Sequence, residues 1–526
     1  MIDSIKVKNY KAFKQAEVKI KPLTVLLGAN SVGKSSILQL FLLLKQTATF
    51  GMRTDKSPFK MYGPFVNMGS VSNLFYFKNE KIPIEFSISF RNAQLQIWMN
   101  KQLTKFIHSF SSIPFLLPIK GLMDLHQNTE AKDRGSFYKL VKGVCDVLRK
   151  QHVDKYRDTL RFLFTGNTEI SESDIDNFSL ENIMKIYDFL ELLRVEQKKI
   201  SSTCYTINFI FNQKAGNLIV SGLSFYIADE EIFSLYENEG FVARTNGNFL
   251  SKEDTIVLEK AFVKKASIFG CLQPSKMDET RSSIANYIAQ IAVHVLDVLK
   301  DEFNPSRIQH VKPLRANPQR YYVIDDEKLT PYVSSLDGDR VIEILRDNET
   351  VREDVKKWLG VYGFSLKIEQ SEDVIHHIKI IQNGLELDIP DVGFGFSQLL
   401  PILVQSKVSP KNSITIIEQP EIHLHPKMQA DVADLFINST SRDNPFIIET
   451  HSEYFLRRIR RRVATGRLSS EDVAIYLFTG SNDESISNKV ERLDMTSTGS
   501  FKWPSDYYDG ELYKDLVEYI TAQTEL

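Results

Sequence analysis

The chain has 526 residues, of which 42% are hydrophobic and 25% are charged, and its formal net charge at pH 7 is -2. This length exceeds one compact core, so two or three lobes are expected, and the balanced charge argues against a surface coated throughout by nucleic acid. The three cysteines match no zinc or disulfide spacing and no apolar stretch is long enough to cross a membrane, so we expect a cytoplasmic protein with reduced thiols.

Residues 1–100 are expected to form the N-terminal part of a nucleotide-binding head. The apolar run 23–27 predicts a buried strand, and residues 36–40 predict the start of a helix. Between them lies the segment Gly28-Ala29-Asn30-Ser31-Val32-Gly33-Lys34-Ser35. It matches G-x-x-x-x-G-K-[ST] in the strand-to-helix context of a loop that binds the phosphates of a nucleoside triphosphate.

The residue types in this loop each have an expected chemical role. Gly28 and Gly33 let the backbone turn its N–H groups toward a phosphate, at the positive end of a helix. Lys34 would reach the β- and γ-phosphates of ATP, and the Ser35 hydroxyl would ligate Mg²⁺. A glycine turn followed by a surface lysine is the alternative, which the flanking pattern disfavours. The residues expected to bind the nucleotide are Gly28, Asn30, Ser31, Gly33, Lys34, Ser35 and Ser36.

The middle of the chain changes its pattern twice. From 101 to 200 the apolar residues recur at helical spacing, which predicts a mostly helical insertion. Strand alternation returns at 205–211, and a helix is expected over 282–299. Residues 201–310 would therefore complete the body with a β-rich segment and a helix.

The second half of the nucleotide site is expected in residues 311–470. A β-branched apolar strand ends in Glu418, at the place where a carboxylate is needed to hold Mg²⁺. An acidic strand end without a role is the alternative. Gln419 and Glu421 follow Glu418 closely. Residues 471–526 read as a C-terminal hairpin and tail.

Another buried strand, 445–450, ends in His451. A histidine at this place can reach the γ-phosphate or hold the attacking water, whereas a packed structural histidine is the alternative. Glu418 and His451 would then both lie at the ends of buried strands.

A glycine-rich turn, 391–395, leads into an apolar helical run. It would present Gly395, Ser397 and Gln398 as a second anion-binding surface at a helix N-terminus. Because the chain already has one phosphate loop, we expect this surface to close on the ATP of a second subunit. The result would be a homodimer that encloses two nucleotides.

Together these motifs resemble the ATP-binding-cassette class of P-loop ATPases, in its SMC-like and OLD-like branch. Within that branch, residues 418–426 (Glu-Gln-Pro-Glu-Ile-His-Leu-His-Pro) and 449–452 (Glu-Thr-His-Ser) are similar to a bacterial AAA-type ATPase group that includes PtuA, found in Septu and retron-linked antiphage systems. The resemblance covers most of residues 1–95 and 305–510. It implies an α/β fold, namely a P-loop ABC-type ATPase head with an antiparallel β subdomain and a mostly helical insertion, and it implies ATP and Mg²⁺ as cofactors.

Most cassette ATPases carry a glutamate directly after the metal-binding carboxylate, and this chain has Gln419 there. An amide can orient a water but cannot accept a proton, and losing a general base typically costs about 10²–10⁴-fold in rate. We therefore expect slow hydrolysis and a long-lived ATP-closed dimer. Glu421 or His451 could compensate. The candidate catalytic residues are Glu418, Gln419, Glu421 and His451.

The resemblance also implies partners. It indicates a regulatory or sensor ATPase that controls a separate HNH effector nuclease of the PtuB kind, and in a retron setting a reverse-transcribed DNA–RNA would be a further partner. The sequence has no His-Asn-His finger, HEXXH motif or Toprim acids, so nuclease activity is expected in a partner. The alternative is an autonomous SMC-like ATPase that clamps DNA during repair, and the lack of sustained heptads around 100–200 counts only against its arm-bearing members. A transporter ATPase is the weakest alternative.

Basic residues after the second buried strand offer a nucleic-acid surface, because helical spacing brings three arginines together. A solvated face neutralised by acids such as Glu471 and Asp472 is the equally weighted alternative. Arg315 and Arg320 could reach a nucleotide or a neighbouring subunit, or they could form ion pairs within the chain. The nucleic-acid candidates are Arg457, Arg460 and Arg461.

Overall fold

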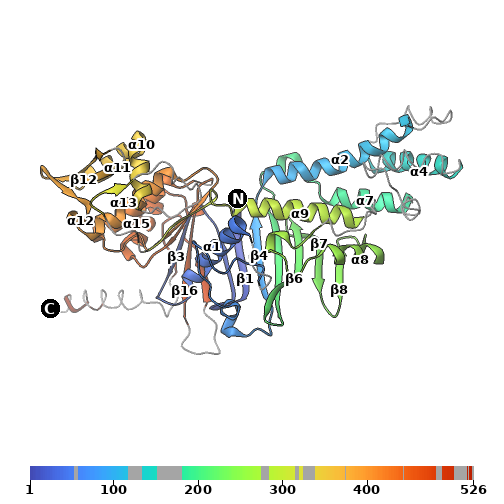
Figure 1. Cartoon of the computed structure of the whole chain (residues 1–526), viewed down its shortest axis with the longest axis horizontal. Helices are drawn as coiled ribbons and strands as arrows, with labels where there is room; N and C mark the ends of the chain where they lie inside the picture. Colours follow the sequence, from blue (N-terminus) through green and yellow to red (C-terminus); the bar gives the residue numbers. More distant parts are fainter. Residues whose placement is uncertain are drawn as a thin grey trace.

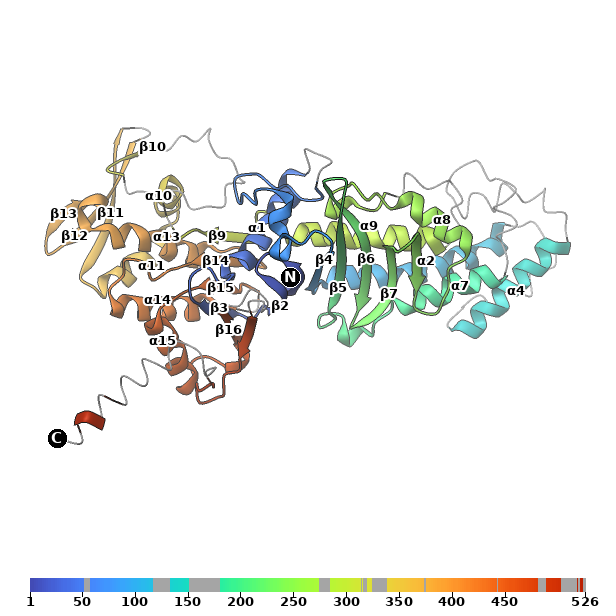
Figure 2. The same cartoon turned by 90° about the horizontal axis from the view of Figure 1, so that it is seen from below.

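The computed structural model describes the chain apart from residues 52–56, 117–132, 151–179, 274–283, 314, 316–318, 324–337, 373–374, 442, 481–488, 503–517, 519–520 and 524–526. The molecule is elongated (Figures 1 and 2), with a parallel sheet near its middle. A small sheet with its helices lies at one end, and an antiparallel sheet with a helical layer extends toward the other.

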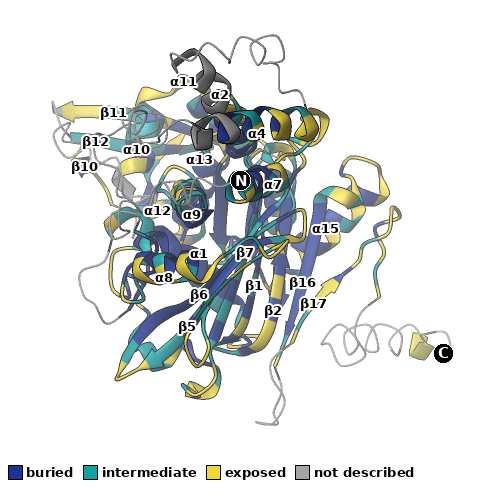
Figure 3. Ribbon diagram, turned by 90° about the vertical axis from the view of Figure 1, so that its right-hand side faces the viewer, coloured by how far each residue is buried: buried dark blue, intermediate teal, exposed yellow. Residues whose placement is uncertain are grey.

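The antiparallel sheet has seven strands in the order β2-β1-β4-β5-β6-β7-β8. Side chains of β4 alternate between buried and partly exposed, as expected for a strand whose successive side chains point to opposite faces. In Figure 3 the strands are mainly buried and the hairpin ends are exposed. The bounds are β1 (Ile2–Tyr10), β2 (Phe13–Lys19), β4 (Ile84–Phe90), β5 (Tyr205–Lys214), β6 (Asn217–Ile227), β7 (Glu230–Glu237) and β8 (Phe241–Thr245).

A layer of helices packs beside this sheet. The long helix α9 runs along the sheet in Figure 1, and it contacts α2, α7 and α8. Within 101–200, the described elements are helices and one short 3₁₀ turn. The bounds are α2 (Ala93–Leu116), α4 (Arg134–Lys150), α7 (Leu180–Leu192), α8 (Lys252–Ala261) and α9 (Ile284–Glu302).

The second large sheet joins the two ends of the chain. Its order is β17-β16-β3-β15-β14-β9, and every pairing except β17–β16 is parallel. The short, fully buried strands β3 and β15 are rich in branched apolar residues, as is typical of parallel sheets covered on both faces. The bounds are β3 (Leu23–Gly28), β9 (Ile308–Val311), β14 (Ile414–Glu418), β15 (Phe446–Glu449), β16 (Val473–Thr479) and β17 (Lys489–Leu493).

This sheet separates two hydrophobic cores. Leu26 of β3 packs into the core shared with the antiparallel sheet, whereas Val25 and Leu27 pack into the core on the other face. The α1 helix follows the phosphate loop, and α13, α14 and α15 belong to the second core's side. The bounds are α1 (Lys34–Phe50), α13 (Phe394–Val408), α14 (Pro426–Ser439) and α15 (Glu453–Ala464).

A small antiparallel sheet completes the far end of the molecule, in the order β10-β12-β11 with β13 also pairing β12. It packs with α10, α11 and α12 against α13. The bounds are β10 (Tyr322–Val323), β11 (Phe364–Glu372), β12 (Ile375–Gln382), β13 (Leu385–Asp388), α10 (Gly338–Asp347), α11 (Glu349–Gly360) and α12 (Ile389–Val392).

In the region where the sequence predicts a C-terminal hairpin, β16 and β17 pair in antiparallel fashion. β16 pairs in parallel with β3 from Val473↔Leu23 to Phe478↔Gly28. The hairpin therefore extends the second large sheet. In the described part of the chain, no helix combines the length and apolarity that crossing a bilayer requires.

Candidate nucleotide-binding site

Two glycines give the loop after β3 its shape. Gly28 has φ 139°, and a Cβ there would lie 2.3 Å from the carbonyl oxygen of Phe478 on the neighbouring strand. Gly33 has φ 106°, and its Cβ would lie 2.4 Å from the Phe13 ring. Ser31 also has positive φ, 65°. Only glycine fits at the two glycine positions, because both the backbone conformation and the space exclude a side chain.

Lys34 lies folded back over this loop. Its side chain is buried, and Nζ donates hydrogen bonds to the carbonyl oxygens of Gly28 (3.0 Å) and Ala29 (2.7 Å). Burial lowers the pKa of Lys34, which the charge of Glu449 partly opposes. These two carbonyl oxygens hold the ammonium group at the loop. The oxygens of a bound phosphate could replace them as its hydrogen-bond partners.

The strand ends bring two carboxylates to the same edge of the sheet. Glu418 ends β14 and Glu449 ends β15, and the two residues are direct partners in the parallel register. Glu449 is also paired with Leu26 of β3, two residues before Gly28. The carboxyl ends of adjacent parallel strands form the usual ligand-binding edge of such sheets.

Glu418 has a partner that the sequence reasoning missed. Nε2 of His310, a buried residue on the edge strand β9, lies 2.6 Å from Oε1 of Glu418. The pairing arises because β9 lies beside β14, more than a hundred residues away along the chain. A lone histidine in an apolar strand is the only signal that the sequence carried.

Glu449 is the second missed residue, although the sequence reasoning named its neighbour His451. Its carboxylate faces the phosphate loop, with the Ser35 hydroxyl at 3.3 Å from Oε2 and Lys34 Nζ at 3.8 Å from Oε1. Glu449 is 4% exposed, and burial together with the charge of Glu418 raises its pKa to about 7.

Gln419 sits in a tight turn directly after β14. Its φ is 46°, and its N–H donates to the carbonyl oxygen of Glu449 at 2.7 Å. Arg315 Nη2 donates to the carbonyl oxygen of Glu418 at 2.8 Å, and more weakly to that of Gln419 at 3.4 Å. Arg315 is buried, which lowers its pKa to about 10. The turn that carries Gln419 is thus held from both sides.

Glu421 and His451 are tied to each other. The carboxylate of Glu421 accepts the Thr450 hydroxyl at 2.8 Å and the backbone N–H of His451 at 2.7 Å. The pKa of Glu421 is raised by burial. The His451 side chain is exposed, and partial desolvation and the Lys34 charge lower its pKa. Glu421 therefore positions the segment that carries His451.

The glycine-rich turn leads into α13 as expected, but its polar side chains face inward in the single chain. Ser397 and Gln398 are 7% and 1% exposed, and Gln398 accepts the backbone N–H of Arg315 at 3.2 Å. A Cβ on Gly395 would lie 2.4 Å from the carbonyl oxygen of His423. Contact with a second subunit's nucleotide stays a prediction.

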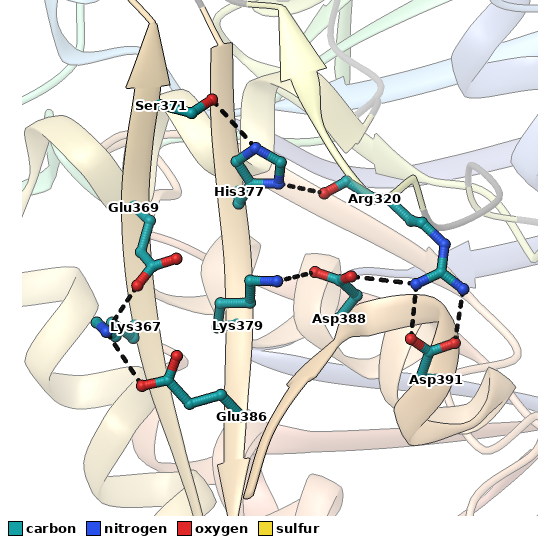
Figure 4. Close-up of polar contacts among 9 residues, drawn as sticks. All are labelled: Arg320, Lys367, Glu369, Ser371, His377, Lys379, Glu386, Asp388 and Asp391. Atoms are coloured by element: carbon teal, nitrogen blue, oxygen red, sulfur yellow. Dashed lines mark hydrogen bonds and ion pairs between the residues drawn. The ribbon is translucent and has the colours of Figure 1, made fainter.

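Arg320 forms ion pairs within the chain, which was one of the alternatives left open (Figure 4). Its guanidinium binds Asp391 through two hydrogen bonds of 2.7 and 2.9 Å, and it binds Asp388 at 3.1 Å. Lys379 of β12 donates to Asp388 at 2.6 Å. These contacts fix α12, which directly precedes the turn into α13.

The three nucleic-acid candidates on α15 have different surroundings. Arg457 is exposed and pairs with Glu453, Arg460 donates to the carbonyl oxygen of Gly499 at 3.0 Å, and Arg461 is exposed. On the same helix, Arg458 and Arg462 bind the carboxylate of Asp434, and Arg458 also binds Asp431. The acids that neutralise this helix therefore include residues of α14, which the sequence reasoning did not name.

Residues 1–456 match the family model described as the AAA ATPase domain. A comparison with curated proteins gives no match. Among solved structures, the chain is similar to an SMC head bound to the C-winged helix domain of ScpA, with 10% identity, a TM-score of 0.39, and 94% of this chain and 98% of that chain covered. It is also similar to the SMC head domain from Thermotoga maritima, with 8% identity, a TM-score of 0.34 and coverage of 94% and 99%.

Proposed function

Since the chain belongs to the family of AAA ATPase domains, we propose that residues 28–35 bind ATP with Mg²⁺ and that the protein is a slowly hydrolysing regulatory ATPase. The observation that carries this proposal is the convergence of Lys34, Ser35 and two strand-end carboxylates at one edge of the parallel sheet. A loop built only to turn the chain would not need a buried lysine facing a buried carboxylate, as Lys34 faces Glu449.

The side chains at this edge fit a magnesium–nucleotide complex. Mg²⁺ takes oxygen ligands and is usually held by one or two carboxylates together with substrate phosphates. Among the described residues no cluster of three or more His, Cys, Asp or Glu could hold a metal ion. Ser35 and Glu418 would hold the ion, whose charge would neutralise the phosphates during transfer.

Slow hydrolysis follows from the groups around the attacking water. Gln419 can orient a water but cannot take its proton. Glu421 already accepts two hydrogen bonds, from the Thr450 hydroxyl and the His451 N–H, so it is committed to holding that segment. His451 is exposed beside the loop and is the remaining candidate to contact the γ-phosphate or the water.

ATP would control assembly. In this proposal, Gly395, Ser397 and Gln398 at the start of α13 close on the nucleotide of a second subunit and form a homodimer. Gln398 contacts the Arg315 backbone, and Arg315 contacts the turn of Gln419. Through these contacts, closure of the dimer could change the conformation of the turn that carries Gln419.

The biological role is carried by the resemblance of residues 418–426 and 449–452 to the PtuA group. The dimer would restrain or position a separate HNH effector nuclease in antiphage defence, with a retron DNA–RNA as a further partner. Co-expression of the chain with the products of neighbouring genes, followed by sizing with and without ATP·Mg²⁺, tests this role. Co-elution of a nuclease with a dimer is expected for the wild type, and Lys34→Ala should lose the ATP dependence. A chain that never associates with a nuclease would refute the role.

A DNA-clamping ATPase is the second candidate, favoured by the exposed Arg457 and Arg461 on α15. It predicts ATP-dependent, salt-sensitive retention of duplex DNA by the chain alone, because each phosphate contact releases counterions. Replacing both arginines with alanine should then weaken DNA retention without changing nucleotide binding. The regulatory role predicts no such retention.

A further inference from the structure

Glu449 occupies the centre of the nucleotide-site edge. Its strand, β15, lies between β3, which leads into the phosphate loop, and β14, which ends in Glu418. Its register partners are Leu26 on one side and Glu418 on the other. The pairing of β15 with its two neighbours therefore places Glu449 between the phosphate loop and the end of β14.

The carboxylate of Glu449 is deeply buried yet weakly bound. The residue is 4% exposed, and the Ser35 hydroxyl lies 3.4 Å from Oε1 and 3.3 Å from Oε2. Lys34 Nζ is 3.8 Å from Oε1, because the ammonium group donates to loop carbonyls instead. Charge-assisted hydrogen bonds to a carboxylate are normally about 2.5–2.9 Å long. A buried carboxylate with only long contacts retains most of its desolvation cost.

The other two glutamates of the site are bound more closely. Glu418 lies 2.6 Å from His310 Nε2, and Glu421 accepts bonds of 2.7 and 2.8 Å. Glu449 is the carboxylate that faces Ser35. The Ser35 hydroxyl and the carboxylate of Glu449 thus place oxygen atoms together at the phosphate loop. Oxygen atoms are the ligands that Mg²⁺ prefers.

We propose that Glu449 is a ligand of the Mg²⁺ that accompanies ATP, together with Ser35 and Glu418. This inference rests on the proposed binding of Mg·ATP at residues 28–35. A divalent cation would offset the repulsion between Glu449 and Glu418, which are register neighbours at the same sheet edge. Glu449 would then link metal binding to the hydrolytic turn, because its carbonyl oxygen accepts the N–H of Gln419 at 2.7 Å.

The test compares Glu449→Gln with a matched control, Glu421→Gln, which makes the same change at a carboxylate that is already bound by the Thr450 hydroxyl and the His451 N–H. Binding of a fluorescent ATP analogue is measured in EDTA, and Mn²⁺ binding to the protein–analogue complex is measured by electron paramagnetic resonance. We expect Glu449→Gln to bind the analogue in EDTA as well as the wild type does, and to lose at least about 10-fold in Mn²⁺ affinity, because even the hydrogen-bond partners of metal ligands typically contribute that much. Glu421→Gln should change the Mn²⁺ affinity less than about threefold.

Equal Mn²⁺ affinity in Glu449→Gln and the wild type, or an equal loss in both variants, would overturn the inference and leave nucleotide binding standing. A wild type that binds no analogue in EDTA or with metal would overturn the proposed function, and the inference with it. If Glu449→Gln fails to fold, Glu449→Asp keeps the charge and shortens the reach. That variant should also weaken Mn²⁺ binding, and wild-type affinity would count against the assignment.

Discussion

Replacing Gln419 with glutamate should speed ATP hydrolysis, which we propose is slow in the wild-type chain. The two side chains have nearly the same shape, and the backbone of this turn is fixed by the bond from Gln419 N–H to the Glu449 carbonyl oxygen (2.7 Å) and by Arg315. The variant should therefore fold as the wild type does. What changes is that a carboxylate able to accept a proton replaces an amide that cannot.

The expected rate increase depends on the carboxylates near position 419. A general base contributes about 10²–10⁴-fold, or roughly 3–5 kcal/mol of barrier. The new carboxylate would join Glu418 and Glu449, which are neighbours at the strand ends, and like charges raise a carboxylate pKa and disfavour its ionised form. We therefore expect the lower end of the range, an increase of about 10²-fold in turnover.

Phosphate release under single-turnover conditions measures the chemical step directly. Affinity for a fluorescent ATP analogue serves as the control and should change little. An increase of less than about threefold, with intact nucleotide binding, would refute the argument that a missing base limits the rate.

Two further predictions concern the loop and the core. Gly33→Ala places a Cβ 2.4 Å from the Phe13 ring at φ 106°, so it should cost about 1–3 kcal/mol in unfolding free energy from backbone strain alone and weaken ATP binding at least about tenfold. Gly360→Ala, whose Cβ would meet no atom within 4 Å, is the matched control, and equal binding by both variants would contradict the geometry. Lys45 is fully buried, its Nζ donates to the Ile308 carbonyl oxygen at 2.6 Å, and burial lowers its pKa to about 7. Because the unfolded chain binds this proton more tightly, Lys45 should make the free energy of unfolding rise from pH 7 toward pH 10, by up to about 1.4 kcal/mol per pH unit. Chemical denaturation across this range should show a smaller rise in Lys45→Met, and an unchanged slope would show that Lys45 does not titrate there.

Local motifs made one half of the site predictable from the sequence. The phosphate loop and the acidic strand are contiguous patterns, because strand, turn and helix must follow one another for Lys34 and Ser35 to reach a phosphate. Gly28 and Gly33 could be named for the same reason, since the loop's backbone demands glycine.

Contacts between distant strands were not predictable in this way. Neither the pairing of His310 with Glu418 nor the position of Glu449 opposite Ser35 follows from spacing, because each depends on which strands become neighbours. The placement of β16 beside β3 is a similar case, since a parallel partner can lie anywhere along the chain. Arg315 was singled out by its proline-bounded loop, but only the fold shows that it holds the turn of Gln419.

Measurement of ATP binding and of the rate of ATP hydrolysis by the wild-type chain tests the proposed function most directly. We expect tight binding of one ATP per chain that depends on Lys34, with turnover about 10²-fold below the common value of roughly 10 per second. Turnover of many per second that is abolished by Glu421→Gln and barely changed at Gln419 would contradict the proposed function.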